Sequence, residues 1–318
     1  MGSPPEPASP GTAPRVVAIM GPTASGKTRL AVALAKELGA ELVNADSRQA
    51  IVELTVGVGK PTPAELQGVA CHGLNWSHLG QPFSVAAYRT LAQAAISEIA
   101  SRGRPAIVVG GTGLYIRALL GGFDFGSVAP DQSRAVPAGS AANARSMAAR
   151  AALDLRQLDP RRAMAVDMEN PRRVLRAAEL ARSGAHPRQF PPPWSSIKLG
   201  CRVGRLELRQ RIEARSDRLV GEPLREEVEL LAAQGFSLEL LGRSAIGYAE
   251  VVDWARGQSE RPEAVQRVAG RTWRYAKSQM TWLRSEPDLH WVNAEGSLNE
   301  MVSQCLVAID SGLMQGTR

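Results

Sequence analysis

Cysteine, lysine and long apolar runs are scarce in this sequence of 318 residues. The cysteines, Cys71, Cys201 and Cys305, are odd in number and far apart, so they form neither a disulfide framework nor a zinc-ligand pattern. No apolar stretch approaches the ~20 residues that span a membrane. Residues 1–14 lack the hydrophobic segment of a signal peptide and are rich in proline, serine and glycine. We therefore expect a cytoplasmic protein with no membrane partner and a disordered tail over residues 1–14.

The charge of the chain is positive and rests on arginine. The net charge is +7 and the pI is near 9.8, which favours a polyanionic partner. Lysine supplies only 5 of the 38 basic residues, namely Lys27, Lys36, Lys60, Lys198 and Lys277. GC-rich codon usage would produce the same bias, so the arginines indicate function only where they cluster on motifs.

The sequence GPTASGKT has the glycine and lysine spacing of a phosphate-binding loop. It follows a β-branched apolar run and precedes a segment with helical spacing, which is the strand–loop–helix context of a P-loop. Backbone N–H groups and the helix N-terminus attract anionic oxygens there. Lys27 adds a positive charge, and the hydroxyl of Thr28 is a ligand for Mg²⁺. The residues expected to bind phosphate groups are Gly21, Pro22, Thr23, Ala24, Ser25, Gly26, Lys27 and Thr28.

Strand and helix patterns alternate on both sides of this loop. The segments are strand 16–20, helix 28–38, strand 41–46, helix 84–103 and strand 105–113. Ser84 is the expected N-cap of the helix at 84–103. Such an order predicts a parallel sheet with right-handed crossovers. The predicted fold class is therefore α/β, with a P-loop NTPase-like parallel sheet flanked by helices.

The periodic pattern breaks after residue 122. Residues 123–150 are rich in alanine, serine, glycine and proline, and helical spacing resumes at about 151–158 and 171–182. A strand at 197–203 then returns the chain to the sheet, a long helix covers 262–284, and 290–294 is expected to be an edge strand. The predicted organisation is a P-loop α/β core over 15–122 and 196–295, a helical insertion over 123–195, and a C-terminal helix or tail over 296–318.

The acidic residues near the loop distinguish between possible reactions. A P-loop ATPase or GTPase has an apolar strand that ends in a carboxylate for the metal, but the third strand here ends in IVVGGTG. Asp46, at the end of the second strand, is the one strand-terminal acid beside the expected phosphate site. It could order magnesium, accept a proton from a nucleophile or cap its own turn.

Eight short motifs together resemble one enzyme family. GPTASGKT, NADSRQ, GKPT, QPFSV, VVGGTGLY, NPRRVLRA, AIGYAEV and RYAKSQMTWLR occur in the order found in tRNA dimethylallyltransferases. The resemblance covers about residues 16–294. It implies transfer of a dimethylallyl group from dimethylallyl diphosphate to N6 of the adenosine just 3′ of the anticodon. The P-loop phosphate would then belong to the departing diphosphate rather than to hydrolysed ATP, in keeping with the missing carboxylate.

The resemblance also implies roles for individual residues. Asp46 matches the proposed general base of the family, and Thr23 matches a residue that holds the diphosphate near the reacting carbon. Arg211, in LRQRIEAR, matches an arginine near the active centre, although the neighbouring Arg209 and Arg215 leave the register open. Mg²⁺ is the expected cofactor, with Thr28 as its protein ligand.

The expected partner is the tRNA anticodon stem-loop, and the protein is expected to act as a monomer. The resemblance also implies that the helical insertion over 123–195 contacts the tRNA. The implied contacts are Asp46, Ser47, Arg48, Gln49, Thr112, Arg134, Arg172, Arg173, Val174, Leu175, Arg176 and Lys277. In the last motif, Trp273, Tyr275 and Trp282 are expected to pack between helices rather than to stack on bases. Where the family has an aromatic residue two positions after Gln49, this chain has Ile51.

Three other functions remain open at this stage. A prenyltransferase for free adenine nucleotides would not need the long basic C-terminal region. A P-loop kinase for a small metabolite would use Asp46 as a base toward a hydroxyl group. A non-catalytic RNA-binding relative would explain the arginines but not the intact Lys27, Thr28 and Asp46.

Overall fold

The computed structural model describes residues 15–121, 123–124, 141–184, 188–189, 192 and 194–315. The predicted tail 1–14 and Arg134 lie outside these residues. The chain separates into two compact units, one of residues 1–121 with 191–318 and the other of residues 122–190.

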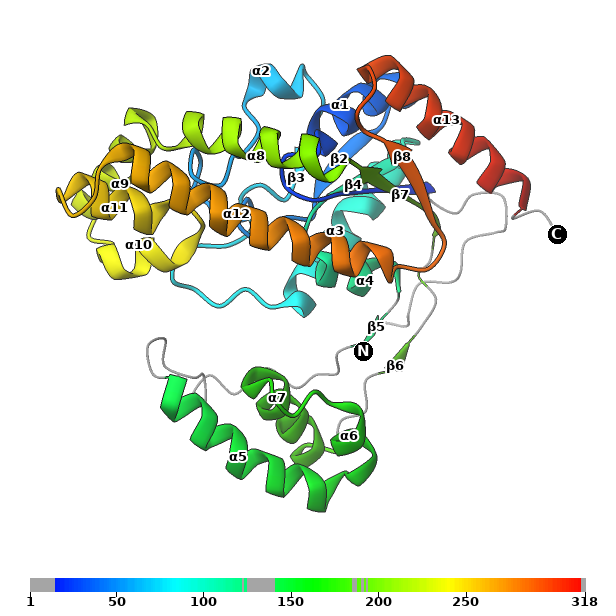
Figure 1. Ribbon diagram of the computed structural model, residues 1–318. Helices are drawn as coiled ribbons and strands as arrows, with labels where there is room; N and C mark the ends of the chain where they lie inside the picture. Colours follow the sequence, from blue (N-terminus) through cyan, green and yellow to red (C-terminus); the bar gives the residue numbers. More distant parts are fainter. Residues whose placement is uncertain are drawn as a thin grey trace. The chain divides into compact units, whose positions relative to one another are not determined.

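A parallel sheet of six strands forms the centre of the larger unit (Figure 1). Its order is β3–β2–β4–β1–β7–β8, and every neighbouring pair is parallel. The strands are β1 (Arg15–Met20), β2 (Glu41–Asn44), β3 (Cys71–His72), β4 (Ala106–Gly110), β7 (Ser195–Arg202) and β8 (Leu289–Asn293). The predicted parallel sheet is confirmed, and β8 is an edge strand as expected.

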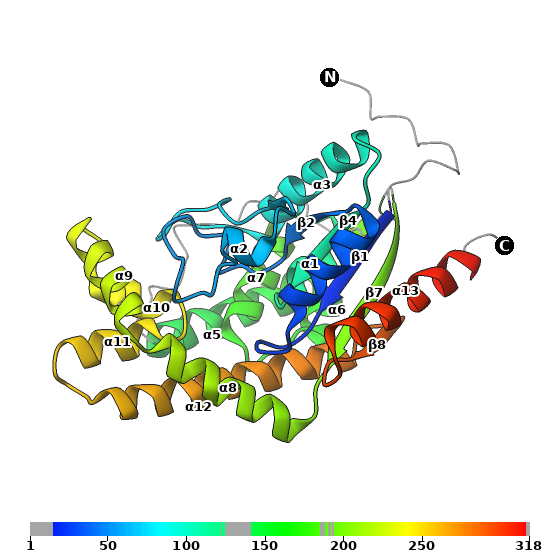
Figure 2. The same cartoon turned by 90° about the horizontal axis from the view of Figure 1, so that it is seen from above.

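Helices cover both faces of this sheet because its strands are apolar on both sides. In β1, Val17 and Ile19 join one buried cluster, whereas Val16, Ala18 and Met20 join the other. The first face is covered by α1 (Lys27–Leu38), α8 (Arg205–Leu219) and α13 (Leu298–Gln315). The second is covered by α3 (Val85–Ser101) and α4 (Gly113–Leu120), and Figure 2 shows α1 and α3 apart on the two sides. Ser84 caps α3, as predicted, by accepting a hydrogen bond from the N–H of Ala87.

The C-terminal helices build a third core against the loop that follows β2. They are α9 (Glu222–Ala233), α10 (Leu238–Ser244), α11 (Tyr248–Ala255) and α12 (Arg261–Arg284). Ile51 and Leu54 from the loop are buried in this cluster with Val228, Tyr248 and Val268. α12 is the longest helix of the described residues, and a short helix, α2 (Pro63–Leu66), lies within the loop.

The smaller unit is helical, as predicted, with a short antiparallel pair of strands, β5 (Phe123–Asp124) and β6 (Arg188–Gln189). Its helices are α5 (Ala141–Leu158), α6 (Pro160–Ala165) and α7 (Pro171–Arg182). The predicted start of α5 at 151 was ten residues too late. Its buried stripe begins with the small residues Ala148 and Ala151 before Leu155, so the apolar periodicity of the sequence is weak there.

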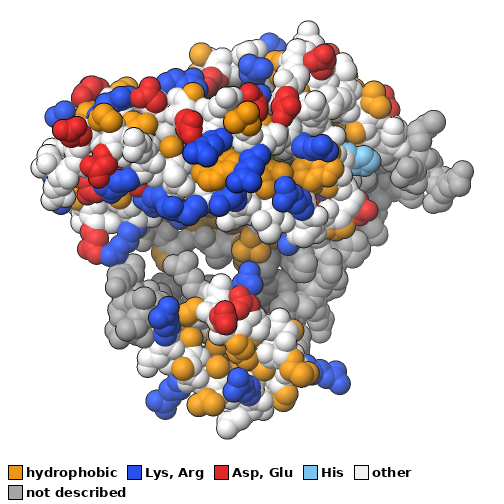
Figure 3. Space-filling model, viewed as in Figure 1, with side chains coloured by type: hydrophobic (Ala, Val, Ile, Leu, Met, Phe, Trp, Pro, Cys, Tyr) orange, Lys and Arg blue, Asp and Glu red, His pale blue; other side chains and the backbone are white. Residues whose placement is uncertain are grey.

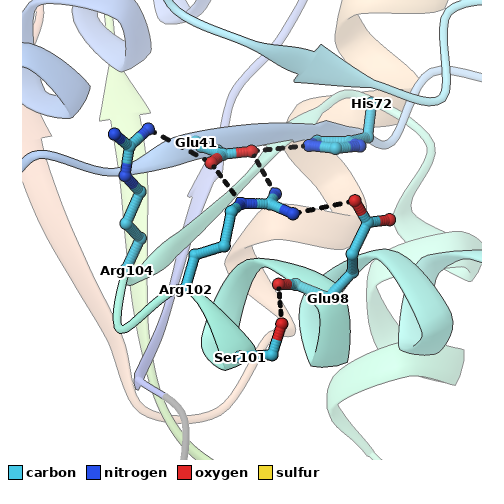
Figure 4. A network of polar contacts seen from close by, with 6 residues as sticks. All are labelled: Glu41, His72, Glu98, Ser101, Arg102 and Arg104. Atoms are coloured by element: carbon cyan, nitrogen blue, oxygen red, sulfur yellow. Dashed lines mark hydrogen bonds and ion pairs between the residues drawn. The ribbon is translucent and has the colours of Figure 1, made fainter.

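A polar network lies at the end of the sheet where β2 begins. The P-loop lies at the opposite end, where β1 ends. Glu41, the first residue of β2, is 4% exposed and receives hydrogen bonds from Arg102 and Arg104 after α3 (Figure 4). His72 Nε2 of β3 lies 2.8 Å from Glu41 Oε2. This network ties together β2, β3 and the end of α3.

Candidate active site

A cleft of about 570 Å³ opens at the carboxyl ends of β1, β2 and β4. The P-loop after β1, the turn after β2 and the turn after β4 meet there, which is where ligands bind in open α/β sheets. α8, α12, the C-terminal end of α10 and the loop after β2 supply the remaining walls. The residues that line the cleft include Thr23, Ala24, Gly26, Lys27, Thr28, Asp46, Ser47, Arg48, Gln49, Thr112, Arg215, Arg271, Tyr275 and Gln279.

The P-loop has the backbone of an anion-binding loop. Ala24 and Gly26 adopt left-handed conformations, with φ of 64° and 82°. Successive N–H groups in such turns form a concave nest for anions, and the first turn of α1 at Lys27 adds the positive end of the helix dipole. Gly21, Pro22 and Ser25 are buried and support the loop from behind rather than lining the cleft.

Positive charge is concentrated and poorly hydrated in this cleft. Burial lowers the pKa of Lys27, the Asp46 carboxylate opposes this change, and the Arg215 guanidinium adds to it. Burial likewise lowers the pKa of Arg215. The Lys27 Nζ donates one hydrogen bond, to the carbonyl of Pro22 at 3.3 Å. A polyanion that entered the cleft would return both cations to a favourable environment.

Asp46 is the cap of its own turn, which is one of the three roles considered for it. Its Oδ1 accepts hydrogen bonds from the N–H groups of Arg48 at 2.9 Å and Gln49 at 3.5 Å, so the carboxylate caps its own turn. Asn44 holds the same turn by accepting from the Asp46 N–H at 3.0 Å and by donating to the Asp46 carbonyl at 3.1 Å. The capped carboxylate also lines the cleft beside Lys27 and Thr28. Its orientation is therefore fixed before any substrate binds.

The glycines of VVGGTGLY serve close packing. A Cβ on Gly110 would lie 2.2 Å from the carbonyl oxygen of Ala45, and one on Gly111 would lie 2.2 Å from Gln279 Nε2. A Cβ on Gly113 would lie 1.5 Å from Trp282 Nε1. Glycine is needed because the β2 turn and α12 press against this segment.

Thr112 and Gln279 hold neighbouring segments of the cleft together. The Thr112 hydroxyl accepts a hydrogen bond from the Ser47 N–H at 3.0 Å. Gln279 Oε1 accepts from the Thr23 N–H at 2.8 Å, and its Nε2 donates to the Gly111 carbonyl at 3.0 Å. Sequence reasoning did not single out Gln279, although it lies in the C-terminal motif that carried the resemblance.

Two expectations about the helices need correction. Arg211 is not among the cleft-lining residues, and its Nε donates to Glu207 Oε1 on the same helix at 2.7 Å. The arginine of α8 in the cleft is Arg215, one turn later, which packs so closely on Gly59 that a Cβ there would lie 2.2 Å from Nη2. Tyr275, expected to pack between helices, is 41% exposed and lines the cleft.

The residues expected to contact tRNA fall into three groups. Asp46, Ser47, Arg48, Gln49 and Thr112 lie together in the cleft. Lys277 is exposed on α12. Figure 3 shows Lys and Arg side chains gathered over α8 and α12. The third group lies on α7 of the smaller unit.

The α7 residues do not all face solvent. Arg173 is exposed and lies 3.5 Å from Asp167, and Arg176 pairs with Glu179 at 3.0 Å. Val174 is 1% exposed, and Leu175 packs on the same cluster. These two apolar side chains hold α7 in its unit, because the helix is amphipathic. The Arg172 side chain lies outside the described part of the chain.

The described residues contain no helix long and apolar enough to cross a membrane and no cluster of three or more His, Cys, Asp or Glu side chains that could hold a metal. Asp46 and Glu65 are the carboxylates among the described cleft residues, and neither follows β1 or β4. A parallel sheet with a P-loop after β1 and an aspartate after β2, with β4 between these two strands, is typical of phosphate-binding proteins of the P-loop class.

Comparison with known proteins identifies the family within this class. The IPP transferase family matches residues 50–286, and the isopentenyl transferase family matches residues 14–83. A tRNA dimethylallyltransferase 1 from Pelobacter propionicus is 38% identical over 92% of this chain and 97% of its own length. A tRNA dimethylallyltransferase from Anaeromyxobacter sp. is 40% identical over 87% of this chain and 94% of its own length. The chain belongs to the IPP transferase family.

Solved structures agree with this assignment. The full-length tRNA isopentenylpyrophosphate transferase from Bacillus halodurans superposes with a TM-score of 0.70 and 30% identity, over 95% of this chain and 98% of that chain. A eukaryotic dimethylallyltransferase acting on tRNA has the same fold, with a TM-score of 0.76 and 21% identity over 96% and 81% of the two chains. The predicted fold class and family are confirmed.

Proposed function

We propose that this protein transfers a dimethylallyl group from dimethylallyl diphosphate to N6 of the adenosine immediately 3′ of the tRNA anticodon, with release of diphosphate. One observation carries the proposal: in a chain of this family, a P-loop with two desolvated cations shares its cleft with a fixed carboxylate. The cleft thus offers an anion site for the leaving group beside a proton acceptor for the nucleophile.

The leaving group is stabilised by the P-loop side of the cleft. The loop N–H groups, Lys27 and Arg215 neutralise the charge that develops on diphosphate as its bond to the allylic carbon breaks. Arg215 takes the role expected for Arg211. The Thr28 hydroxyl, in the first turn of α1, would hold a Mg²⁺ in the cleft. When bound, that ion would supply further charge stabilisation.

Asp46 acts on the acceptor. An exocyclic amine is a weak nucleophile, so its orientation matters as much as its basicity. The Asp46 carboxylate accepts an N6 hydrogen bond, aligns the amine with the allylic carbon and takes the proton as the new C–N bond forms. The hydrogen bonds from Arg48 and Gln49 keep the carboxylate in place during this step.

The acceptor adenosine must leave the anticodon-loop stack to reach Asp46. Arg48, Gln49 and Tyr275 line the cleft and can contact the extruded base and its sugar–phosphate backbone. Exposed arginines of α7 and exposed cations of α12 bind phosphates of the anticodon stem. The reaction takes place in the cytoplasm, with the protein as a monomer.

An Asp46→Asn variant tests this assignment. An asparagine Oδ1 can still accept from the Arg48 N–H, so the turn is kept while the base is lost. We expect prenyl transfer to fall by about 10²–10⁴-fold, and binding of pyrophosphate with Mg²⁺ to stay within about threefold, because the P-loop is unchanged.

The matched control is Asp159→Asn. Asp159 caps α6 by accepting from the Arg162 N–H at 2.9 Å, and it should tolerate the change with full transfer activity. Loss of pyrophosphate binding in Asp46→Asn, or retention of transfer, would contradict the role of Asp46 as the base.

A further inference from the structure

Gln279 joins three segments of the active site through one side chain. It lies on α12 and is 4% exposed. Its Oε1 accepts from the Thr23 N–H in the P-loop at 2.8 Å, and its Nε2 donates to the Gly111 carbonyl after β4 at 3.0 Å.

The chemistry of these contacts requires an amide. A backbone N–H can only donate and a backbone carbonyl can only accept, so Thr23 and Gly111 present one donor and one acceptor to the same side chain. A primary amide satisfies both. A carboxylate would satisfy Thr23 but repel the Gly111 carbonyl, and a thioether would leave both buried groups unpaired. The glycine at 111 is needed for the approach, because a Cβ there would lie 2.2 Å from Nε2.

The amide fixes the P-loop where its conformation matters for phosphate binding. Thr23 directly precedes Ala24, whose left-handed conformation (φ 64°) belongs to the anion nest. Since the Thr23 N–H donates a hydrogen bond to Gln279 of α12, the start of the loop is held in its binding geometry before a ligand enters. Arg271 and Tyr275 of α12 line the same cleft, so the helix that anchors the loop also forms a wall of the site.

We propose that Gln279 is a positioning residue for the prenyl donor. It preorganises the P-loop, so its loss raises the KM for dimethylallyl diphosphate more than it lowers kcat. The expected change in the KM for dimethylallyl diphosphate rests on the proposed function. The expected change in pyrophosphate affinity rests on the structure of the P-loop alone.

Two substitutions test the proposal. Gln279→Met keeps the length of the side chain and removes both hydrogen bonds. We expect the KM for dimethylallyl diphosphate and the Kd for pyrophosphate with Mg²⁺ to rise about tenfold, because ordering a P-loop that is no longer held in place costs a free energy on the scale of one net hydrogen bond. kcat at saturating donor should stay within about threefold of wild type.

Gln279→Glu should bind the donor in a pH-dependent way. Its protonated carboxyl donates to the Gly111 carbonyl and accepts from the Thr23 N–H, so donor binding at acidic pH should approach that of wild type. Ionisation at higher pH places a carboxylate against that carbonyl and near the diphosphate, and the KM should rise. The cleft also contains other titratable groups, namely Lys27, Asp46, Arg215 and Tyr275. The KM of the variant is therefore divided by the KM of the wild type at each pH, because these groups are present in both proteins.

Gln304 of α13 supplies the matched control. Its Oε1 accepts a backbone hydrogen bond from Asn293 at 2.8 Å, and it does not line the cleft. Gln304→Met and Gln304→Glu should leave the KM and its pH dependence unchanged.

A pyrophosphate Kd unchanged in Gln279→Met, or a Gln279→Glu ratio independent of pH, would overturn the proposal. If Gln279→Met does not fold, the pH ratio of Gln279→Glu decides. A wild type that binds pyrophosphate but transfers nothing would refute the proposed function, while the Kd values would still decide the role of Gln279.

Discussion

Replacement of Glu41 by glutamine should destabilise the fold at neutral pH and remove part of its acid sensitivity. The Glu41 carboxylate is 5% exposed and receives hydrogen bonds from Arg102 Nη2 at 2.7 Å and Arg104 Nη1 at 3.2 Å. The bonds from Arg102 are the largest cause of a pKa lowered from 4.5 to about 2, and His72 adds to the effect while burial opposes it. Figure 4 shows these groups converging on one carboxylate.

The magnitude follows from the difference in pKa between the folded and unfolded states. A folded-state pKa of about 2 against 4.5 corresponds to about 3 kcal/mol of stabilisation at neutral pH. Because the pKa is depressed in the folded protein, this stabilisation is complete above about pH 5 and is lost as the pH falls toward 2. Glutamine can still accept a hydrogen bond, and Arg102 is 38% exposed and regains hydration. We therefore expect a loss of about 2 kcal/mol in Glu41→Gln.

Urea unfolding at about pH 7 and about pH 3 measures this loss. The deficit of Glu41→Gln should be present at the higher pH and nearly absent at the lower. Glu98→Gln is the matched control, because Glu98 also pairs with Arg102 but is 63% exposed, and it should cost less than about 0.5 kcal/mol. Equal losses in the two variants, or a Glu41→Gln deficit that does not change with pH, would refute the reasoning.

The remaining predictions concern ligand binding. Arg215→Ala should raise the Kd for pyrophosphate with Mg²⁺ by about 10- to 100-fold. Arg211→Ala removes a charge outside the cleft lining and should change this Kd less than about threefold. Calorimetry on both variants measures the two Kd values, and equal effects would contradict the placement of Arg215. Changing Arg172 and Arg173 together to alanine should weaken tRNA binding and reduce the slope of log K against log salt by about 1 to 2. Filter binding across a salt series measures the slope, and an unchanged slope would show that these arginines do not contact phosphate.

Much of the core could be predicted from local sequence. The strand–loop–helix order around GPTASGKT, the N-cap at Ser84 and the long helix before Arg284 all depend on contacts between near neighbours in the chain. Such features leave a periodic or capping signal that a single sequence carries. The placement of Asp46 beside the P-loop also followed, because the carboxyl ends of parallel strands meet at one edge.

Features that depend on distant contacts were missed. Gln279 bonds to Thr23 across 256 positions of the chain, and no local pattern marks it as part of the P-loop. The choice between Arg211 and Arg215 depends on how α8 crosses the cleft, since both positions have the same residue type and similar spacing. Ile51 stands where the family has an aromatic residue near the target base, but its side chain is buried in the third core. Its neighbours in that core come from α9 to α12, which sequence spacing could not bring together with the loop.

The most direct test of the account combines the purified protein with Mg²⁺, labelled dimethylallyl diphosphate and unmodified tRNA whose anticodon is followed by adenosine. AMP and ATP serve as parallel acceptors, and nucleoside mass analysis identifies the product. The account predicts N6-dimethylallyladenosine at the position 3′ of the anticodon, one pyrophosphate released per transfer, and no label on AMP or ATP. Label on a free nucleotide in place of tRNA, or consumption of ATP without prenylation, would contradict it.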